Sequence, residues 1–262
     1  VDAMFTATSA TCVTGLIVRD TWTQFTMFGQ VVILLLIQVG GLGLVTLTSF
    51  FALAAKRRMG FRDLRLLGES VSVSGYSQAT EVLKIVIKLA FLFEAIGIVL
   101  LAAAFVPQFG LEGLWVSVFT AISAFCNAGF DLFGRFGQYS SLVPYVNNYY
   151  VQAVIMFLIM AGGLGFMVWV ELGEWRKKRR LSLHAKVVLA FSVILWVGGA
   201  VLIGLMEWSN PATMGGLSTS GKIMASLFQS VSTRTAGMNT IDLAACGPIT
   251  KLLMSVLQFI GA

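Results

Sequence analysis

The chain has 262 residues, of which 57% are hydrophobic and 11% are charged, and its mean hydropathy is +0.87. Soluble domains carry about a quarter charged residues, so this composition excludes a soluble domain and predicts a membrane protein. The net charge of +6 does not indicate nucleic-acid binding, because most basic residues lie in two clusters, Lys56 to Lys88 and Arg176 to Lys186. Such clusters beside membrane spans mark the cytoplasmic side and attract anionic lipid.

Apolar runs long enough to cross a bilayer alternate with runs of about half that length. A crossing needs ~20 apolar residues, and the predicted crossings are Gln24 to Ala55, Ile85 to Val106 (stopping at Pro107), Tyr149 to Glu171 and Val187 to Trp208. Another descent begins at Lys251. The half-length runs are residues 3–12, 115–125 and 222–232. A short helix followed by extended backbone survives at membrane depth only inside protein or beside water, so these runs predict re-entrant helices.

Each half-length run leads into a related glycine motif. Thr11-Cys-Val-Thr-Gly15 is followed 114 residues later by Phe125-Cys-Asn-Ala-Gly129, and Thr233-Arg-Thr-Ala-Gly237 comes 108 residues after that. The preceding residues are also alike, since Phe5-Thr-Ala-Thr-Ser-Ala10 corresponds to Phe119-Thr-Ala-Ile-Ser-Ala124. The third copy, Phe228-Gln-Ser-Val-Ser232, fits only with a one-residue gap. Self-similarity at a nearly fixed period indicates a repeat architecture.

Two predicted crossings separate each glycine motif from the next. An even number of crossings makes all three loops enter the membrane from one side, the external side. The repeats are therefore parallel, whereas inverted repeats would send loops in from opposite sides. The predicted fold is an all-α membrane protein with parallel repeats of helix, re-entrant helix with filter loop, and helix around a central pore.

A second glycine signature follows each of the first two loops. Gly40-Gly-Leu-Gly43 matches Gly162-Gly-Leu-Gly165, and Gly261 begins a third copy. Glycines on a membrane helix usually permit close helix packing. A dinucleotide-binding interpretation fails, because no soluble strand-turn-helix context surrounds the glycines.

The repeated loops have the chemistry of a cation filter. A dehydrated alkali cation needs several oxygens at once, and a ring of backbone carbonyls supplies them. Glycine permits the positive φ that turns carbonyls toward one axis, and the negative end of each short helix favours a cation. The candidate ligands are the carbonyls of Val13, Thr14, Gly15, Asn127, Ala128, Gly129, Thr235, Ala236 and Gly237. The candidate filter supports are Thr11, Cys12, Phe125, Cys126, Thr233 and Arg234.

The whole chain resembles the Trk/Ktr/HKT superfamily of K+ transporters. The stretch from Phe5 to Gly15, with Asp20-Thr21 and Ile37-Gln-Val-Gly-Gly41, looks most like the membrane subunit of Ktr-type systems. Residues 232–240 look like that family's third filter loop. The resemblance implies four repeats around one pore, so the chain looks like a fragment lacking the first helix and the fourth repeat.

This resemblance divides the chain and implies its partners. The expected segments are repeat 1 (1–58), a cytoplasmic loop (59–82), repeat 2 (83–175), a basic cytoplasmic loop (176–186) and repeat 3 with a truncated second helix (187–262). The implied protein is a homodimer in the cytoplasmic membrane, in contact with lipid, with external filter loops and cytoplasmic nucleotide-binding regulatory subunits. K+ is the implied transported ion, driven by the membrane potential, with no covalent cofactor; Na+ coupling stays open.

Few side chains suggest other chemistry. His184 is the single histidine and has no nucleophile or metal partner, so no enzyme is predicted. Cys12, Cys126 and Cys246 lack metal-ligand spacing and favour packing roles. Glu94 lies within a crossing, where we favour a hydrogen bond to a neighbouring helix over ion contact. For Arg234 we favour hydrogen bonds that hold the filter loop over repulsion of cations at the mouth.

Two other functions are compatible with a chain of this kind. One is a solute or water channel with re-entrant loops, which the entry of all three loops from one side argues against. The other is a membrane scaffold without transport activity, in which the glycines serve packing alone. Substitution of Gly129 separates these, because packing damage lowers folded yield, whereas filter damage alters cation selectivity.

Overall fold

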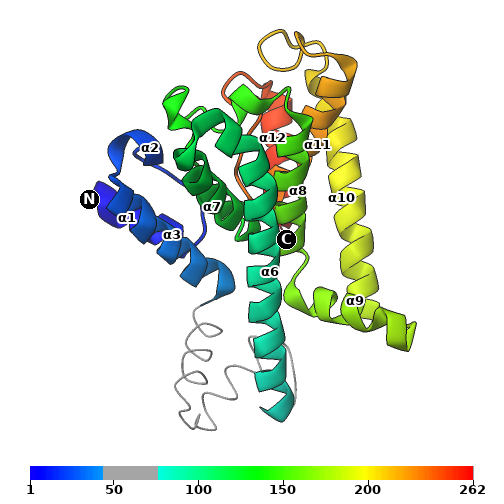
Figure 1. Ribbon diagram of the computed structural model, residues 1–262. Helices are drawn as coiled ribbons and strands as arrows, with labels where there is room; N and C mark the ends of the chain where they lie inside the picture. The colour runs from blue at the N-terminus through cyan, green and yellow to red at the C-terminus, as the bar shows by residue number, and fades with distance from the viewer. Residues whose placement is uncertain (44–75, 262) are drawn as a thin grey trace.

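The computed structural model describes residues 1–43 and 76–261, and the regular elements in these ranges are helices (Figure 1). The prediction of an all-α membrane protein is confirmed. In chain order the elements are α1 (Asp2–Thr11), α2 (Thr21–Gln24), α3 (Met27–Leu42), α6 (Tyr76–Phe109), α7 (Leu111–Phe125), η1 (Phe133–Arg135), η2 (Val143–Tyr145), α8 (Tyr149–Gly163), α9 (Phe166–Lys178), α10 (Leu183–Glu207), α11 (Thr219–Thr235) and α12 (Pro248–Ile260).

Two helices of the described ranges are long and apolar enough to cross a membrane. These are α6 over Leu83–Phe109 and α10 over Leu183–Glu207. The pair α8 and α9 reaches the same length and hydropathy together, but is bent by 96°. The helix α6 includes Pro107 and continues to Phe109, two residues beyond the predicted stop.

The predicted crossing from Tyr149 to Glu171 is interrupted in the structure, because the helix breaks at Gly165. Gly165 has φ +81° and serves as the N-cap of α9. The indole of Trp169 donates to the carbonyl of Ala161 across the break at 2.8 Å. Gly43 has the same position in the earlier copy of the signature, with φ +79°, and it ends α3. The remainder of the predicted crossing to Ala55, and most of the predicted loop 59–82, lie outside the described residues.

The glycines before these breaks permit close packing, as the sequence indicated. A Cβ on Gly40 would overlap the carbonyl of Thr11 at the end of α1, and a Cβ on Gly162 would overlap the carbonyl of Phe125 at the end of α7. Each signature therefore brings a helix against the end of a preceding short helix.

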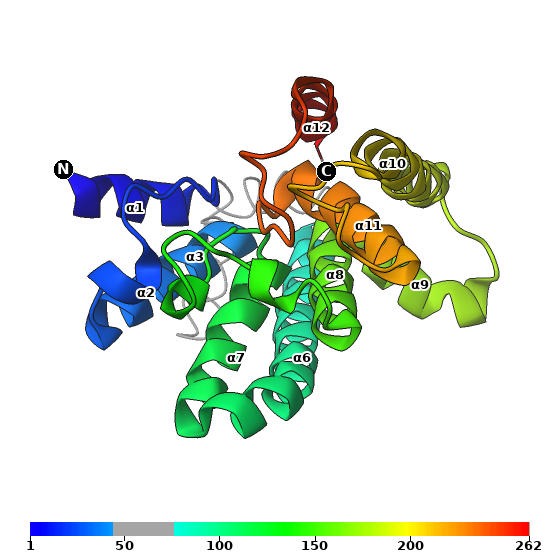
Figure 2. The same cartoon turned by 90° about the horizontal axis from the view of Figure 1, so that it is seen from above.

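The three short helices α1, α7 and α11 are directed toward a common centre when the molecule is seen from above (Figure 2). They correspond to the predicted half-length helices, although α7 begins at Leu111 and α11 extends from Thr219 to Thr235. Their inner ends carry the glycine motifs.

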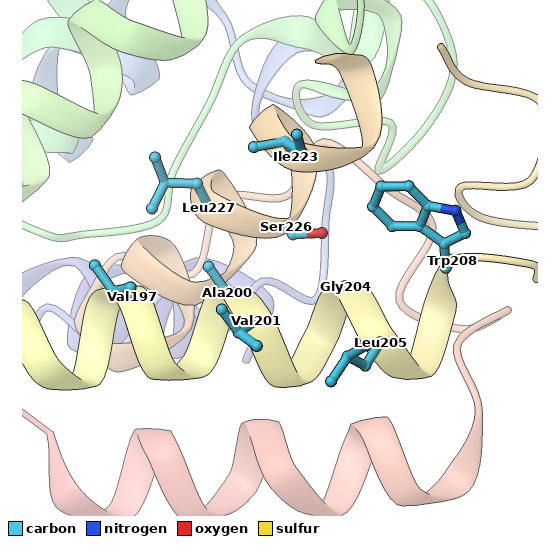
Figure 3. Close-up of a pocket in the computed structure, with 9 residues that line it drawn as sticks. All are labelled: Val197, Ala200, Val201, Gly204, Leu205, Trp208, Ile223, Ser226 and Leu227. Carbon is cyan, nitrogen blue, oxygen red and sulfur yellow. The ribbon is translucent and has the colours of Figure 1, made fainter. Parts of the chain in front are cut away.

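The connection between a long helix and the short helix that follows it is much shorter in α6–α7 than in α10–α11. Gly110 alone separates α6 from α7, and Gly113 of α7 lies directly against the backbone of Phe105 of α6. Residues 208–218 separate α10 from α11. An apolar groove of about 360 Å³ remains between those two helices, with Val201 and Leu205 on one wall and Ile223 and Leu227 on the other (Figure 3).

Candidate cation filter

The three glycine loops, defined as residues 12–16, 126–130 and 236–238, meet at one point of the fold. A Cβ added at Gly15 would lie 3.0 Å from the carbonyl oxygen of Ala128, and one added at Gly129 would lie 2.6 Å from that of Ala236. A Cβ on Gly237 would lie 3.7 Å from the Cα of Gly129. Each of the first two glycines thus faces the carbonyl that precedes the glycine of the next loop. Segments more than 100 residues apart in sequence form one continuous backbone cluster.

All three glycines have the backbone conformation expected for such loops. Their φ angles are +70°, +73° and +74° for Gly15, Gly129 and Gly237. The first two loops add a second left-handed residue two positions earlier, because Val13 and Asn127 both have φ +55°. An L residue other than glycine reaches this region at a cost of about 1–2 kcal/mol. The strain indicates that the surrounding structure holds these two loops firmly.

The third loop differs from the first two because it is one residue shorter. Six positions separate Ser9 from Gly15 and Ser123 from Gly129, but five separate Ser232 from Gly237. Helix α11 continues to Thr235, and Ala236 stays right-handed with φ −87°. The one-residue gap seen in the sequence therefore removes the left-handed residue before the glycine.

A cavity of about 300 Å³ lies beside the three loops. Val13, Asn127 and Thr235, each two residues before a motif glycine, all line it. Its remaining walls come from the end of α7 and the two glycine signatures, with Gly41, Phe125, Cys126, Gly162, Gly163, Gly165 and Phe166. The amide oxygen of Asn127 is buried and has no hydrogen-bond partner among the described residues. A cavity of this size with polar groups in its lining can hold water.

Two of the predicted supporting residues, Phe125 and Cys126, pack against neighbouring helices. The ring of Phe125 stacks on Phe93 of α6 at 6.0 Å between centroids, and Gly41 of α3 lies against the thiol of Cys126. Thr11 and Thr233 donate to backbone carbonyls one helical turn earlier, at 2.8 and 2.6 Å. Cys12 is exposed. The supporting role of these residues remains a prediction.

Two charged side chains near the loops have identified partners. Glu94 of α6 accepts a hydrogen bond of 2.8 Å from the amide of Gln38 on α3, which confirms the predicted bond to a neighbouring helix. Arg234 donates from Nε to the carbonyl of Gly261 at 2.9 Å and stacks over Trp196. This hydrogen bond of Arg234 leads to the end of α12 and not to the glycine loop, and its role in holding the filter loop remains a prediction.

An aspartate follows the second glycine loop. The Asp131 carboxyl accepts hydrogen bonds from the Phe133 N–H at 3.0 Å and from Ser141. Burial nevertheless raises the pKa of Asp131 to about 6, since the loss of water outweighs those two bonds. The corresponding residue of the third loop is Asn239, whose N–H donates to the same Ser141 at 3.3 Å. Ser141 therefore joins the two loops just beyond their glycines.

Backbone oxygens are the natural candidates for cation ligands at this place. Within residues 1–43 and 76–261, no three His, Cys, Asp or Glu side chains come close enough together to hold a metal ion. The glycine loops, in contrast, bring carbonyl-bearing backbone from three parts of the chain together between apolar helices. These features define the class as a membrane protein of the cation-transport type.

The chain belongs to the family described as TrkH, cation transport protein, whose model matches residues 1–262. It is 39% identical over its whole length to the Ktr system potassium uptake protein B of Bacillus subtilis and covers 58% of that protein. It is 36% identical to the potassium/sodium uptake protein NtpJ of Enterococcus hirae, covering 57%. A Ktr system potassium uptake protein B of Vibrio alginolyticus is 39% identical, with 57% covered. The chain thus spans somewhat more than half the length of these relatives.

Proposed function

We propose that this chain is the ion-conducting part of a K+ uptake protein, with backbone carbonyls of the glycine loops as the selectivity filter. The observation that carries the proposal is the meeting of Gly15, Gly129 and Gly237, each with positive φ, at one point between apolar helices. The names of the relatives, potassium uptake proteins and a potassium/sodium uptake protein, support K+ as the ion. Because one relative is named a potassium/sodium uptake protein, Na+ is a second candidate ion, and whether its movement is coupled to that of K+ stays open.

In this proposal the nine candidate carbonyls replace part of the hydration shell of K+. A filter of this kind selects by the spacing and field strength of its oxygens. The first two loops each contain two residues with positive φ, whereas the third contains its glycine alone. The third loop therefore presents its carbonyls differently, and the filter is asymmetric. The membrane potential drives the cation inward through the row of carbonyls, and no covalent cofactor takes part.

The proposed setting follows the family. The glycine loops face the outside of the cytoplasmic membrane, the basic loops face the cytoplasm, and the full-length protein is a homodimer regulated by cytoplasmic nucleotide-binding subunits. Support for the orientation comes from the basic residues between Arg176 and Lys186, which lie from the end of α9 to the start of α10.

The test uses the full-length protein in bacteria that lack K+ uptake of their own. Wild type is expected to restore growth at limiting K+. Gly129→Ser, at matched membrane amount, should lower the preference for K+ over Na+ by about tenfold, because a strain of about 1–2 kcal/mol falls on the filter loop. A Cβ at this position would also lie 2.6 Å from the oxygen of Ala236 and push the third loop outward.

The matched control is Gly137→Ser, since Gly137 lies in a loop and its added Cβ meets nothing closer than the Cβ of Ser140 at 3.9 Å. This variant should grow and select like wild type. Failure of wild type, even with regulatory subunits supplied, contradicts the transport function and favours the scaffold. Loss of folded yield in Gly129→Ser without any change of selectivity contradicts the filter.

A further inference from the structure

Each short helix carries a buried serine near its inner end. Ser9, Ser123 and Ser232 each follow a phenylalanine by four positions, and their exposed fractions are 4%, 0% and 0%. A buried hydroxyl needs a hydrogen-bond partner. The partners of these serines lie in the glycine loops.

Ser123 holds the second glycine loop on both sides of its glycine. Its carbonyl accepts the N–H of Ala128 at 2.8 Å, just before Gly129. Its hydroxyl donates to the carbonyl of Phe130 at 2.6 Å, just after Gly129. One residue of α7 therefore fixes both ends of the segment that carries the candidate ligands.

Ser232 makes the same pair of contacts to the third loop. Its carbonyl accepts the N–H groups of Ala236 at 2.8 Å and Gly237 at 3.1 Å. Its hydroxyl donates to the carbonyl of Met238, the residue that follows the glycine. The same kind of contact forms although this loop is one residue shorter, so an equivalent serine bonds to each of two loops of different length.

Ser9 anchors the first loop differently. Its carbonyl accepts the N–H of Thr14 at 3.0 Å, but its hydroxyl pairs with the Thr14 hydroxyl at 2.9 Å. The partner of the serine hydroxyl is thus the side chain of Thr14 in the first loop and a backbone carbonyl in the other two.

We propose that Ser123 and Ser232 are positioning residues for ion selectivity, acting through the carbonyls of Phe130 and Met238. The hydroxyl turns each of these carbonyls back toward its short helix, which ends the row of ligands at Gly129 and Gly237. It also fixes the depth of each glycine along the pore, and with it the spacing of the oxygens that compete with water for the cation. This inference rests on the proposed function and names residues through which the filter keeps its shape.

The experiment measures uptake of K+ in competition with Na+ by the full-length protein carrying Ser123→Ala or Ser232→Ala, at matched membrane amount. Without the hydroxyl each freed carbonyl rotates, and the preference for K+ should fall about threefold or more, the effect of one lost buried hydrogen bond. The controls are Ser117→Ala and Ser226→Ala on the same two helices. These serines are also buried, but their hydroxyls bond to carbonyls of their own helix, Gly113 at 2.6 Å and Lys222 at 2.7 Å, and not to the glycine loops. The Ser226 hydroxyl also lies 3.5 Å from the sulfur of Met214, in the connection before α11.

The controls should keep the wild-type preference even where they lower folded yield. Should Ser123→Ala fail to reach the membrane, Ser123→Cys keeps the shape with a weaker donor, and it should show an intermediate preference. Unchanged preference in all Ser123 and Ser232 variants overturns the inference, while a Gly129→Ser defect in the same assay leaves the filter intact as a proposal. A wild-type protein without K+ uptake overturns both.

Discussion

The helices α6, α7 and α8 and the helices α10, α11 and α12 follow the same order, yet different chemistry holds each set together. The first set closes on an aromatic cluster, in which Phe105, Phe133 and Tyr145 lie 5.3–5.5 Å apart between ring centroids. The second set closes on the buried carboxylate of Glu207, at the end of α10. The same order of helices is therefore stabilised by aromatic packing in one set and by a buried carboxylate in the other. We call each of these contact regions a joint, apolar in the first set and polar in the second.

The polar joint is fully hydrogen-bonded. One oxygen of Glu207 accepts from the Thr250 hydroxyl at 2.6 Å and the Gly247 N–H at 2.9 Å. The other oxygen accepts from Asn210 and Thr213, both at 2.7 Å. The longer connection between α10 and α11 supplies Asn210 and Thr213, whereas the single residue between α6 and α7 has no room for such partners. Connection length thus determines which kind of joint can form.

The largest expected effect comes from removing this carboxylate. Glu207→Ala leaves four donors without their acceptor, and we expect the free energy of unfolding to fall by roughly 4 kcal/mol. Glu207→Gln keeps the shape and one acceptor oxygen, so it should cost less than half as much. Thermal unfolding of the purified full-length protein in detergent measures both. Equal stability of the alanine variant and wild type would show that these four hydrogen bonds do not stabilise the fold.

A smaller effect separates Asp131 from its counterpart Asn239. Since the folded pKa of Asp131, about 6, lies above its usual value of 3.8, the folded protein binds this proton more tightly. Its contribution to stability is therefore greatest below about pH 4 and falls by about 3 kcal/mol as the pH rises through 6. Asp131→Asn should remove this fall. Unfolding measured at pH 4, 5, 6 and 7 provides the test, and an unchanged slope in the variant contradicts it.

The smallest effect concerns the residue two positions before each glycine. Asn127 is left-handed with φ +55°, whereas Thr235 ends a regular helix. Asn127→Ala should lower the free energy of unfolding by about 1 kcal/mol, because alanine tolerates this conformation less well than asparagine. Thr235→Ala is the matched control and should change stability little. Equal costs at the two positions, measured by the same unfolding assay, would mean that the loops share one conformation.

Much of the fold and part of the candidate site follow from local sequence. The apolar runs predict α6 and α10, the half-length runs predict α1, α7 and α11, and each motif glycine has the positive φ assigned to it. The break at Gly165 does not follow from hydropathy, because the apolar run continues through it. The signal for it lies in Gly162-Gly-Leu-Gly165, which indicates close packing, although glycine also weakens a helix. The hydrogen bonds from Ser123 and Ser232 to the loops could not be predicted either, since a serine in a repeat shows only a similarity and not the carbonyl that it contacts.

The sequence by itself determined which segments are helical, where three glycine motifs recur and that the third is one residue shorter. These are properties of hydropathy, spacing and the conformational freedom of single residues. The tertiary structure alone decided that Gly15, Gly129 and Gly237 meet, that Gln38 is the partner of Glu94 and that serines hold two of the loops. Such contacts join residues far apart in the chain, and they form only when several helices pack around the same buried backbone.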